Sequence, residues 1–251
     1  MPIVKKATDD WNRGFTLIEM SIVLVIIGLI IGGILKGQEI IASARQKAVI
    51  NQVNAVRSAA NTYFDRYRAL PGDDPNATKI DPALSAGDGN GVVGGNYANA
   101  AALGGAITTS PVSENYQFFN GLMASNLLNG GHVTSGTTPT GGTLQFGTTA
   151  LPAAPITGSG MTVIYGTQGG GGVGLARTTH WVRIHKGPDY SQAPIVALSP
   201  RTLANIDIQT DDGLPDNGGV RANDATSCNT VGGDYLASDD PGCIPLFEIT
   251  Q

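Results

Sequence analysis

The sequence predicts an α+β protein in which a long N-terminal helix, its first half transmembrane, packs on a small antiparallel β-sheet head with long loops. Three observations favour this class. An apolar run occupies residues 15–35, an amphipathic pattern continues it through residue 69, and residues 70–251 combine turn-rich segments with short strand patterns. Together with the polar leader at residues 1–14, the chain is expected to have four regions.

The charge of the chain is divided unevenly between these regions. Through residue 69 there are 9 Lys and Arg against 5 Asp and Glu, and from residue 70 onward there are 6 against 15, which gives a net charge of -5 over 251 residues. An acidic total argues against a basic nucleic-acid-binding domain, so no nucleic acid is expected as a partner. A charged share of only 14% with 35 glycines is typical of a loop-rich extracytoplasmic domain.

Residues 15–35 predict a membrane-spanning helix. The segment reads FTLIEMSIVLVIIGLIIGGIL, and its only ionisable side chain is Glu19. At a rise of about 1.5 Å per residue it covers roughly 30 Å, the thickness of the hydrocarbon layer, and it exceeds the apolar stretch of an ordinary secretory signal. The alternative is the core helix of a soluble protein, which is seldom apolar over such a length at the start of a chain.

Glu19 requires an explanation beyond membrane insertion. A carboxylate inside the hydrocarbon layer is costly, so an intramembrane acid marks a functional site whose partner must be found. The simpler alternative is an acid close enough to the membrane surface to stay hydrated, because Glu19 follows Phe15 by only four residues.

From Lys36 to about Tyr67 the pattern becomes amphipathic, with apolar residues recurring mostly at intervals of three and four. Joined to the membrane segment, it predicts a helix of about 50 residues, on the order of 75–80 Å long, ended by the Leu70-Pro71-Gly72 breaker. The apolar stripe is expected to dock on the head. Its expected members are Ile41, Ala44, Ala48, Ile50, Val53, Val56, Ala60, Phe64 and Tyr67.

The head is expected to mix two short helices with a small sheet. The helices are placed at residues 113–128, capped by Ser113 and stopped by Gly130, and at residues 199–207, after a Ser-Pro start. Strand patterns are placed at residues 144–146, 161–165, 179–185 and 194–198, and edge strands at residues 220–222 and 246–249. The intervening Gly-, Asn- and Thr-rich segments are expected to be irregular loops.

No catalytic constellation is found, and the protein is not expected to be an enzyme. Gly169, Gly171 and Gly174 satisfy the spacing of a dinucleotide-binding loop, but such a loop must open a helix after a strand. Here residues 175–185 are expected to form a strand, so a flexible hairpin loop is the better interpretation.

Acidic residues cluster in several turns, and calcium is the cofactor these turns could hold. Calcium takes six to eight oxygen ligands, which acidic Gly/Asn turns outside the cell can supply. The candidate ligands are Asp211, Asp212 and Asp216, with solvated turns as the alternative for every such cluster. The GDGNG segment at Asp88 fails the EF-hand spacing, because Val92 and Asn99 occupy its fifth and twelfth positions.

The start of the apolar run resembles the processing and methylation site of type IV prepilins and type II secretion pseudopilins. Residues 13–19 read RGFTLIE and continue directly into the apolar segment. The resemblance implies cleavage between Gly14 and Phe15 by a prepilin peptidase, methylation of the new amino terminus at Phe15, and an assembly role for Glu19. In that family the acid pairs with the positive amino terminus of a neighbouring subunit, so that two costly charges form one site.

The resemblance implies a pilin-like fold and a filament subunit, either a minor pilin or a pseudopilin. It places the precursor in the bacterial inner membrane, as a single-pass protein with its head in the periplasm, and the assembled subunit in a periplasmic or extracellular filament. The implied partners are other pilin-like subunits, the prepilin peptidase and methyltransferase, an inner-membrane assembly platform and membrane lipid. The alternative is a membrane-tethered binding or enzymatic domain that never polymerises.

Two further features bear on the resemblance. Many pilins have a proline about twenty residues into the mature helix, where this chain has Lys36. Any local unwinding of the helix is therefore expected at the glycines between Gly28 and Gly37.

Cys228 and Cys243 enclose a loop near the carboxyl terminus, and pilins often close a loop there with a disulfide. Outside the cytoplasm pairing is expected, worth about 3 kcal/mol in the chain-entropy model, with two free thiols as the alternative.

Overall fold

A computed structural model of the chain describes residues 15–94, 96–97, 114–130, 146–147, 151–168, 175–186, 196–223, 227–230 and 233–249. The leader at residues 1–14, with Gly14, lies outside these ranges. The chain divides into two compact units, Met1–Ala44 and Arg45–Gln251. The second unit holds the C-terminal part of the first helix together with the head.

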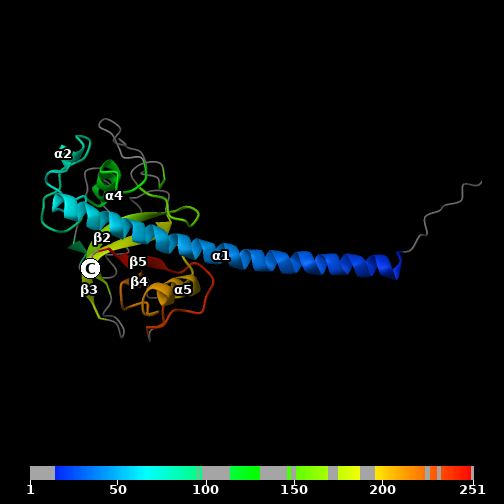
Figure 1. The fold of residues 1–251 in the computed structure, drawn as a ribbon. Helices are drawn as coiled ribbons and strands as arrows, with labels where there is room; N and C mark the ends of the chain where they lie inside the picture. The colour runs from blue at the N-terminus through cyan, green and yellow to red at the C-terminus, as the bar shows by residue number, and fades with distance from the viewer. Residues whose placement is uncertain are drawn as a thin grey trace, which may run out of the picture. The chain divides into compact units, whose positions relative to one another are not determined.

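The predicted long helix is present as α1, Leu17–Tyr67, and is 51 residues long (Figure 1). It is continuous through all the glycines between Gly28 and Gly37. It ends slightly before the expected breaker, because Arg68 adopts the left-handed conformation with a φ of 56°. The Arg68 N–H still donates to the Phe64 carbonyl at 2.8 Å, which closes the last turn.

The buried face of α1 differs from the expected stripe. Phe64 was expected to face the head but is 45% exposed, and Ile41 and Ala44 are also exposed. Tyr63, which the expected stripe left out, is fully buried. A helix turns about 100° per residue, so an error of one position moves a side chain off the docking face. The buried residues of α1 are Val49, Val53, Val56, Ala59, Ala60 and Tyr63.

The described strands of the head form a five-stranded sheet with the order β1-β2-β3-β5-β4. Figure 1 shows β2, β3, β4 and β5 of this sheet. The strands β2, β3, β5 and β4 are antiparallel to their neighbours, and the two-residue β1 pairs with β2 in parallel. The α+β class with an antiparallel sheet is therefore confirmed. The bounds are β1 Asn96–Tyr97, β2 Ser159–Gln168, β3 Arg177–Lys186, β4 Val220–Asn223 and β5 Ile244–Glu248.

The strand expectations are partly correct. The patterns at residues 161–165 and 179–185 lie within β2 and β3, which pair antiparallel. Gly169, Gly171 and Gly174, which were expected to form a flexible hairpin loop, lie outside the described residues. The expected edge strand at 220–222 is β4. The prediction that residues 246–249 form an edge strand was wrong. These residues belong largely to β5, which lies between β3 and β4, and all five residues of β5 are buried. Full burial on both sides hides the alternation that marks an edge.

Two short strand patterns did not form strands in the described residues. Phe146 lies in a turn, and the remainder of the pattern at 144–146 lies outside the described residues. At the end of the pattern 194–198, Leu198 makes only an isolated bridge to Cys243. A short apolar run specifies burial, and the strand forms only where a partner strand is within reach.

In the described part of the head, three short helices accompany the sheet. The expected helix at 199–207 is α5, Pro200–Thr210, and the Ser199 side chain caps it by accepting from the Thr202 N–H. The helix expected at 113–128 is α4, Glu114–Ala124, and it ends early because Asn126 has a φ of 57°. Ser113 lies outside the described residues. The one-turn helix α2, Ala77–Ile80, was not predicted from the sequence.

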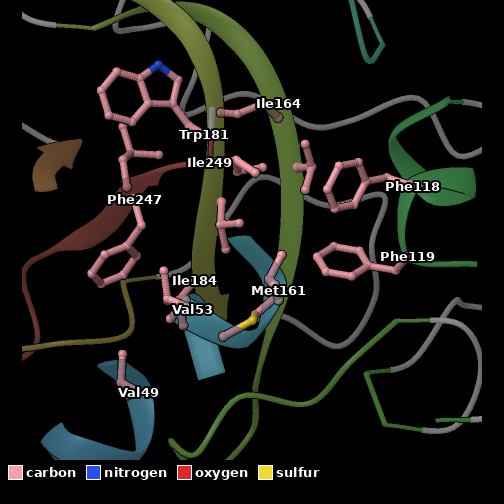
Figure 2. Close-up of a cluster of buried hydrophobic side chains, with 14 of the residues drawn as sticks. Val49, Val53, Phe118, Phe119, Met161, Ile164, Trp181, Ile184, Phe247 and Ile249 are labelled. Atoms are coloured by element: carbon pink, nitrogen blue, oxygen red, sulfur yellow. The ribbon is translucent and has the colours of Figure 1, made fainter. Parts of the chain in front are cut away.

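The core of the second unit is assembled from α1, α4 and the sheet. Figure 2 shows Val53 of α1 beside Ile184 of β3, and the rings of Phe118 and Phe119 pointing from α4 toward β2. Trp181 is fully buried, and its indole N–H donates to the Gly166 carbonyl at 3.0 Å. The long helix is therefore a structural part of the head from about Val49 onward.

Candidate functional site

The N-terminal end of α1 is closed by hydrogen bonds between Thr16 and Glu19. The backbone N–H and the hydroxyl of Thr16 each donate to Glu19 Oε2 at 2.8 Å. The Glu19 N–H lies 3.3 Å from Thr16 Oγ1, which completes a reciprocal capping box. The carboxylate is thereby held at the start of the helix, where the macrodipole favours negative charge.

The apolar half of α1 is exposed on all sides. Leu17 is 93% exposed and Phe15 is 80% exposed, and no residue of the most apolar stretch is buried. Among the described residues, α1 is the one helix that is long and apolar enough to cross a membrane. An exposed helix with no polar face requires apolar surroundings, supplied either by lipid or by other helices.

The comparisons with known proteins identify this segment. A family model described as the prokaryotic N-terminal methylation motif matches residues 12–35. The chain carries this methylation motif. The match covers Gly14, Phe15 and Glu19, and it is consistent with the type IV prepilin and pseudopilin family that the sequence resembles. Comparison with curated proteins and with solved structures gave no significant match.

The methylation motif supports several coarser statements about the protein. The motif is consistent with a pilin-like precursor, and it implies processing by a peptidase and pilin-like partners. An apolar helix that follows such a motif fits anchoring in a membrane. The motif points to a structural subunit and not to an enzyme.

The second candidate feature is a carboxylate cluster formed by Asp73, Asp88 and Glu114. One carboxylate oxygen from each lies within 4.8 Å of the others. Asp73 is buried and accepts hydrogen bonds from three consecutive backbone amides, those of Gly89, Asn90 and Gly91. The GDGNG turn is therefore folded around a buried anion. In the sequence, Asp73 and Asp88 stand in separate acidic turns, and Glu114, 26 positions after Asp88, has no local signal that connects it with them.

Glu114 and Asp73 occupy their oxygens with backbone donors. Glu114 accepts from the Asp88 N–H at 3.2 Å and from the Gly94 N–H at 2.9 Å. Burial raises the pKa of both Asp73 and Glu114, while the backbone donors lower it. Because these carboxylates are satisfied by the loop itself, the cluster is explained as a loop-organising device.

A third cluster lies at the C-terminal end of α5 and contains Asp207, Asp211 and Asp212, with one carboxylate oxygen from each within 4.8 Å of the others. Of the expected calcium ligands, Asp211 and Asp212 belong to it. Asp216 does not, and both its oxygens face the Asn229 amide at 3.3 Å. Asp207 belongs to the same run of acids in the sequence but was not among the three candidate ligands, although its i, i+4 spacing to Asp211 on a helix is a usable signal.

Asp207 is the most deeply buried acid of this cluster. Its exposed fraction is 0%, and Oδ2 accepts from the Tyr235 hydroxyl at 2.9 Å. Oδ1 has no hydrogen-bond partner within normal geometry in the described part of the chain. Burial raises the pKa of Asp207 to about 7, although the hydrogen bond from Tyr235 and the Gly213 amide lower it.

A pocket of about 390 Å³ adjoins this region and is lined by residues of α1, β3, α5, β4 and β5, among them Arg57, Arg177 and Glu248. Arg177 pairs with Glu248 at 2.9 Å, and Arg57 Nε donates to the Glu248 carbonyl. Because Glu248 and Asp211 balance the two arginines, the pocket has no net excess of one charge.

The structure joins Cys228 and Cys243 in the expected disulfide.

Proposed function

We propose that the protein is a filament subunit, a minor pilin or a pseudopilin, that assembles through the N-terminal half of α1. A prepilin peptidase cleaves after Gly14, Phe15 becomes the methylated first residue, and the inner-membrane assembly platform then extracts the subunit from lipid. The single observation that carries the proposal is the methylation motif at residues 12–35, whose apolar part forms the exposed start of α1.

Glu19 has the central role in this proposal. The membrane segment has no other ionisable side chain, and in the sequence Glu19 follows the proposed new amino terminus at Phe15 by four residues. In a filament the apolar helices pack together, so the carboxylate loses contact with water and needs a positive partner. The amino terminus of a neighbouring subunit is the nearest cation that the motif supplies.

Processing is tested by mass spectrometry of the protein isolated from cells that contain a prepilin peptidase. The expected N-terminal peptide begins with methylated Phe15. The matched control is Gly14→Ala, which changes the residue before the proposed cleavage point and leaves the mature chain unaltered. Protein that still begins with Met1 in the presence of the peptidase contradicts the proposal.

Assembly is tested by Glu19→Gln, with Glu39→Gln as the matched control on the same helix. Glu39 is exposed and pairs with Lys36 at 2.6 Å, outside the predicted membrane segment. We expect Glu19→Gln to insert into the membrane normally but to abolish filaments, as measured by shearing and by electron microscopy of cells that express the subunit. Glu39→Gln is expected to assemble like the wild type.

The same pair of variants separates the proposal from its alternative. A membrane-tethered binding domain that never polymerises requires only an apolar anchor, so neither substitution changes its behaviour. If the extent of crosslinking between subunits is the same in the wild type, Glu19→Gln and Glu39→Gln, the membrane-tethered binding domain is favoured. Loss of crosslinking in Glu19→Gln alone supports assembly.

A further inference from the structure

We propose that the pocket beside the C-terminal end of α5 binds a carboxylate group, and that Arg57 and Arg177 are the residues that contact it. Its volume of about 390 Å³ falls within the range of small-molecule sites, roughly 300–1,000 Å³. The lining residues lie in the second compact unit, Arg45–Gln251. The proposal therefore goes beyond filament assembly and does not depend on the methylation motif.

The two arginines converge on Glu248, the last residue of β5. Arg57 of α1 donates from Nε to the Glu248 carbonyl, and Arg177 at the start of β3 donates from Nη2 to Glu248 Oε1 at 2.9 Å. Glu248 is only 7% exposed, so both guanidinium groups are attached to a fixed point of the fold. Two guanidinium groups that are held by the same residue in the lining of a pocket are preorganised to bind one anion.

The charges that line the pocket balance, but the acids already have hydrogen-bond donors within the protein. Asp211 Oδ2 accepts from two backbone amides at the start of β4. Glu248 accepts from Arg177 and from the Thr179 side chain. A ligand therefore gains little by contacting the acids of the pocket.

The arginines, in contrast, keep donors that the described residues do not use. A guanidinium carries five N–H donors in a planar fork. Besides Glu248, Arg57 has only Asn54 Oδ1 near it, 3.4 Å from Nη1, and Arg177 bonds only Glu248 within the described ranges. Burial lowers the pKa of Arg57, although the charges of Glu248 and Asp211 raise it. The cation is thus incompletely compensated, and an anion in the pocket supplies the missing acceptor.

Arg221 adds a positive charge next to the pocket. It is buried and donates to the carbonyl of Gly218, which lines the pocket, and to the carbonyls of Gln168 and Leu175. Burial lowers the pKa of Arg221, and the nearby charge of Arg177 lowers it further. Because these hydrogen-bond acceptors are uncharged carbonyls, the potential in the pocket is more positive than its lining alone indicates.

A carboxylate fits this pocket better than other charged groups do. It is planar, so it can accept two parallel hydrogen bonds from one guanidinium fork. Its single charge suits a pocket in which Asp211 and Glu248 repel a doubly charged phosphate. A cation would have to compete with the donors that the two acids already bind. The carboxylate can belong to a small free acid or to an acidic side chain of another polypeptide.

The test measures binding of succinate to the full-length protein in detergent by isothermal titration, with succinamide as the uncharged analogue. Wild type is expected to bind succinate and not succinamide. Arg177→Gln is expected to weaken binding at least about tenfold, because charge-assisted hydrogen bonds are lost.

The matched control is Arg201→Gln, which is expected to bind succinate like the wild type. Arg201 pairs with Asp239 at 2.8 Å and is 55% exposed, against 46% for Arg177, but it does not line the pocket. Arg57→Lys retains the charge and loses the planar fork, so it is expected to weaken binding several-fold. If Arg57→Lys does not fold, the comparison of Arg177→Gln with Arg201→Gln still tests the site.

The source of the carboxylate is decided by titration with the peptide acetyl-Gly-Asp-Gly-amide. Binding at least about tenfold tighter than that of succinate supports an acidic side chain of another polypeptide, and equal or weaker binding supports a small free acid. The proposal is overturned if the wild type binds neither probe up to about 10 mM. Equal affinity of Arg177→Gln and Arg201→Gln for succinate overturns it as well, and so does equal affinity of the wild type for succinate and for succinamide or inorganic phosphate.

Discussion

The Tyr63 hydroxyl donates a hydrogen bond to Asp74 Oδ2 at 3.0 Å and joins the last turns of α1 to the turn that follows the helix. Both residues are buried, and the pKa of Tyr63 is raised, chiefly by burial and then by the Asp74 charge. The long helix is thus fixed to the head by a polar contact as well as by its apolar face.

The first prediction concerns this contact. Tyr63→Phe removes the donor and leaves the buried Asp74 oxygen without it, so the free energy of unfolding is expected to fall by about 1–3 kcal/mol. Tyr67→Phe removes a hydroxyl one turn later that does not bond Asp74, and it is expected to change stability by less. Urea unfolding followed by circular dichroism measures both. Equal effects of the two substitutions would show that the contact contributes nothing.

The second prediction concerns the GDGNG turn. Asp73→Asn keeps one acceptor oxygen but removes the charge that binds three consecutive amides. Charge-assisted hydrogen bonds are stronger than neutral ones, so the substitution is expected to cost about 2–3 kcal/mol. Asp88→Asn alters an exposed acid of the same cluster and is expected to cost less. Amide exchange at Gly89, Asn90 and Gly91 should accelerate in Asp73→Asn, and unchanged exchange there would contradict the prediction.

The third prediction concerns the acid stability of the head. His180 is buried, and its Nε2 accepts from the Val93 N–H at 3.1 Å, which only the neutral ring allows. Burial lowers the pKa of His180 from 6.5 to about 4. The unfolded chain therefore binds more protons between these values, so stability is complete above about pH 6.5 and is lost as the pH falls toward 4.

The measurement compares thermal unfolding of wild type and His180→Gln from pH 7 to pH 4. Burial of His185 lowers its pKa to about 3 and adds to the slope in both proteins, so the difference between them isolates His180. The variant is expected to be less stable at pH 7 and to lose less stability on acidification, by about 2–3 kcal/mol. Parallel curves for the two proteins would rule out titration of His180 as the cause.

The fourth prediction concerns the disulfide. Cys228 and Cys243 are separated by 15 positions, and Cys243 exchanges backbone hydrogen bonds with Leu198 next to α5. Replacing both cysteines by serine is expected to lower the free energy of unfolding by about 3 kcal/mol. Reductant should destabilise the wild type by a similar amount and leave the double variant unchanged. The prediction is contradicted if the free energy of unfolding of the wild type, measured after unfolding and refolding, is the same with and without reductant.

Much of the fold follows from local patterns in the sequence. The 51-residue α1, the strands β2 and β3, and α5 with its Ser199 cap were all predicted, because each depends on periodicity or on a terminal residue. The features that were predicted wrongly depend on contacts with other helices and strands. Phe64 was assigned to the docking face in place of Tyr63, and β5 was taken for an edge although β4 pairs with its outer side. A single strand does not record how many neighbours it has.

By itself, the sequence determined the N-terminal segment of the molecule, up to the end of the apolar part of α1. The methylation motif, the apolar helix and the solitary Glu19 are contiguous features, so the membrane segment and the proposed assembly site can be read without a fold. Only the tertiary structure decided the clusters of the head. Glu114 lies 41 positions from Asp73, and Tyr235 lies 28 positions from Asp207, so neither pairing has a local signal. Burial, which leaves Asp207 with an oxygen lacking a partner, exists only once α5 and the loops around it are packed.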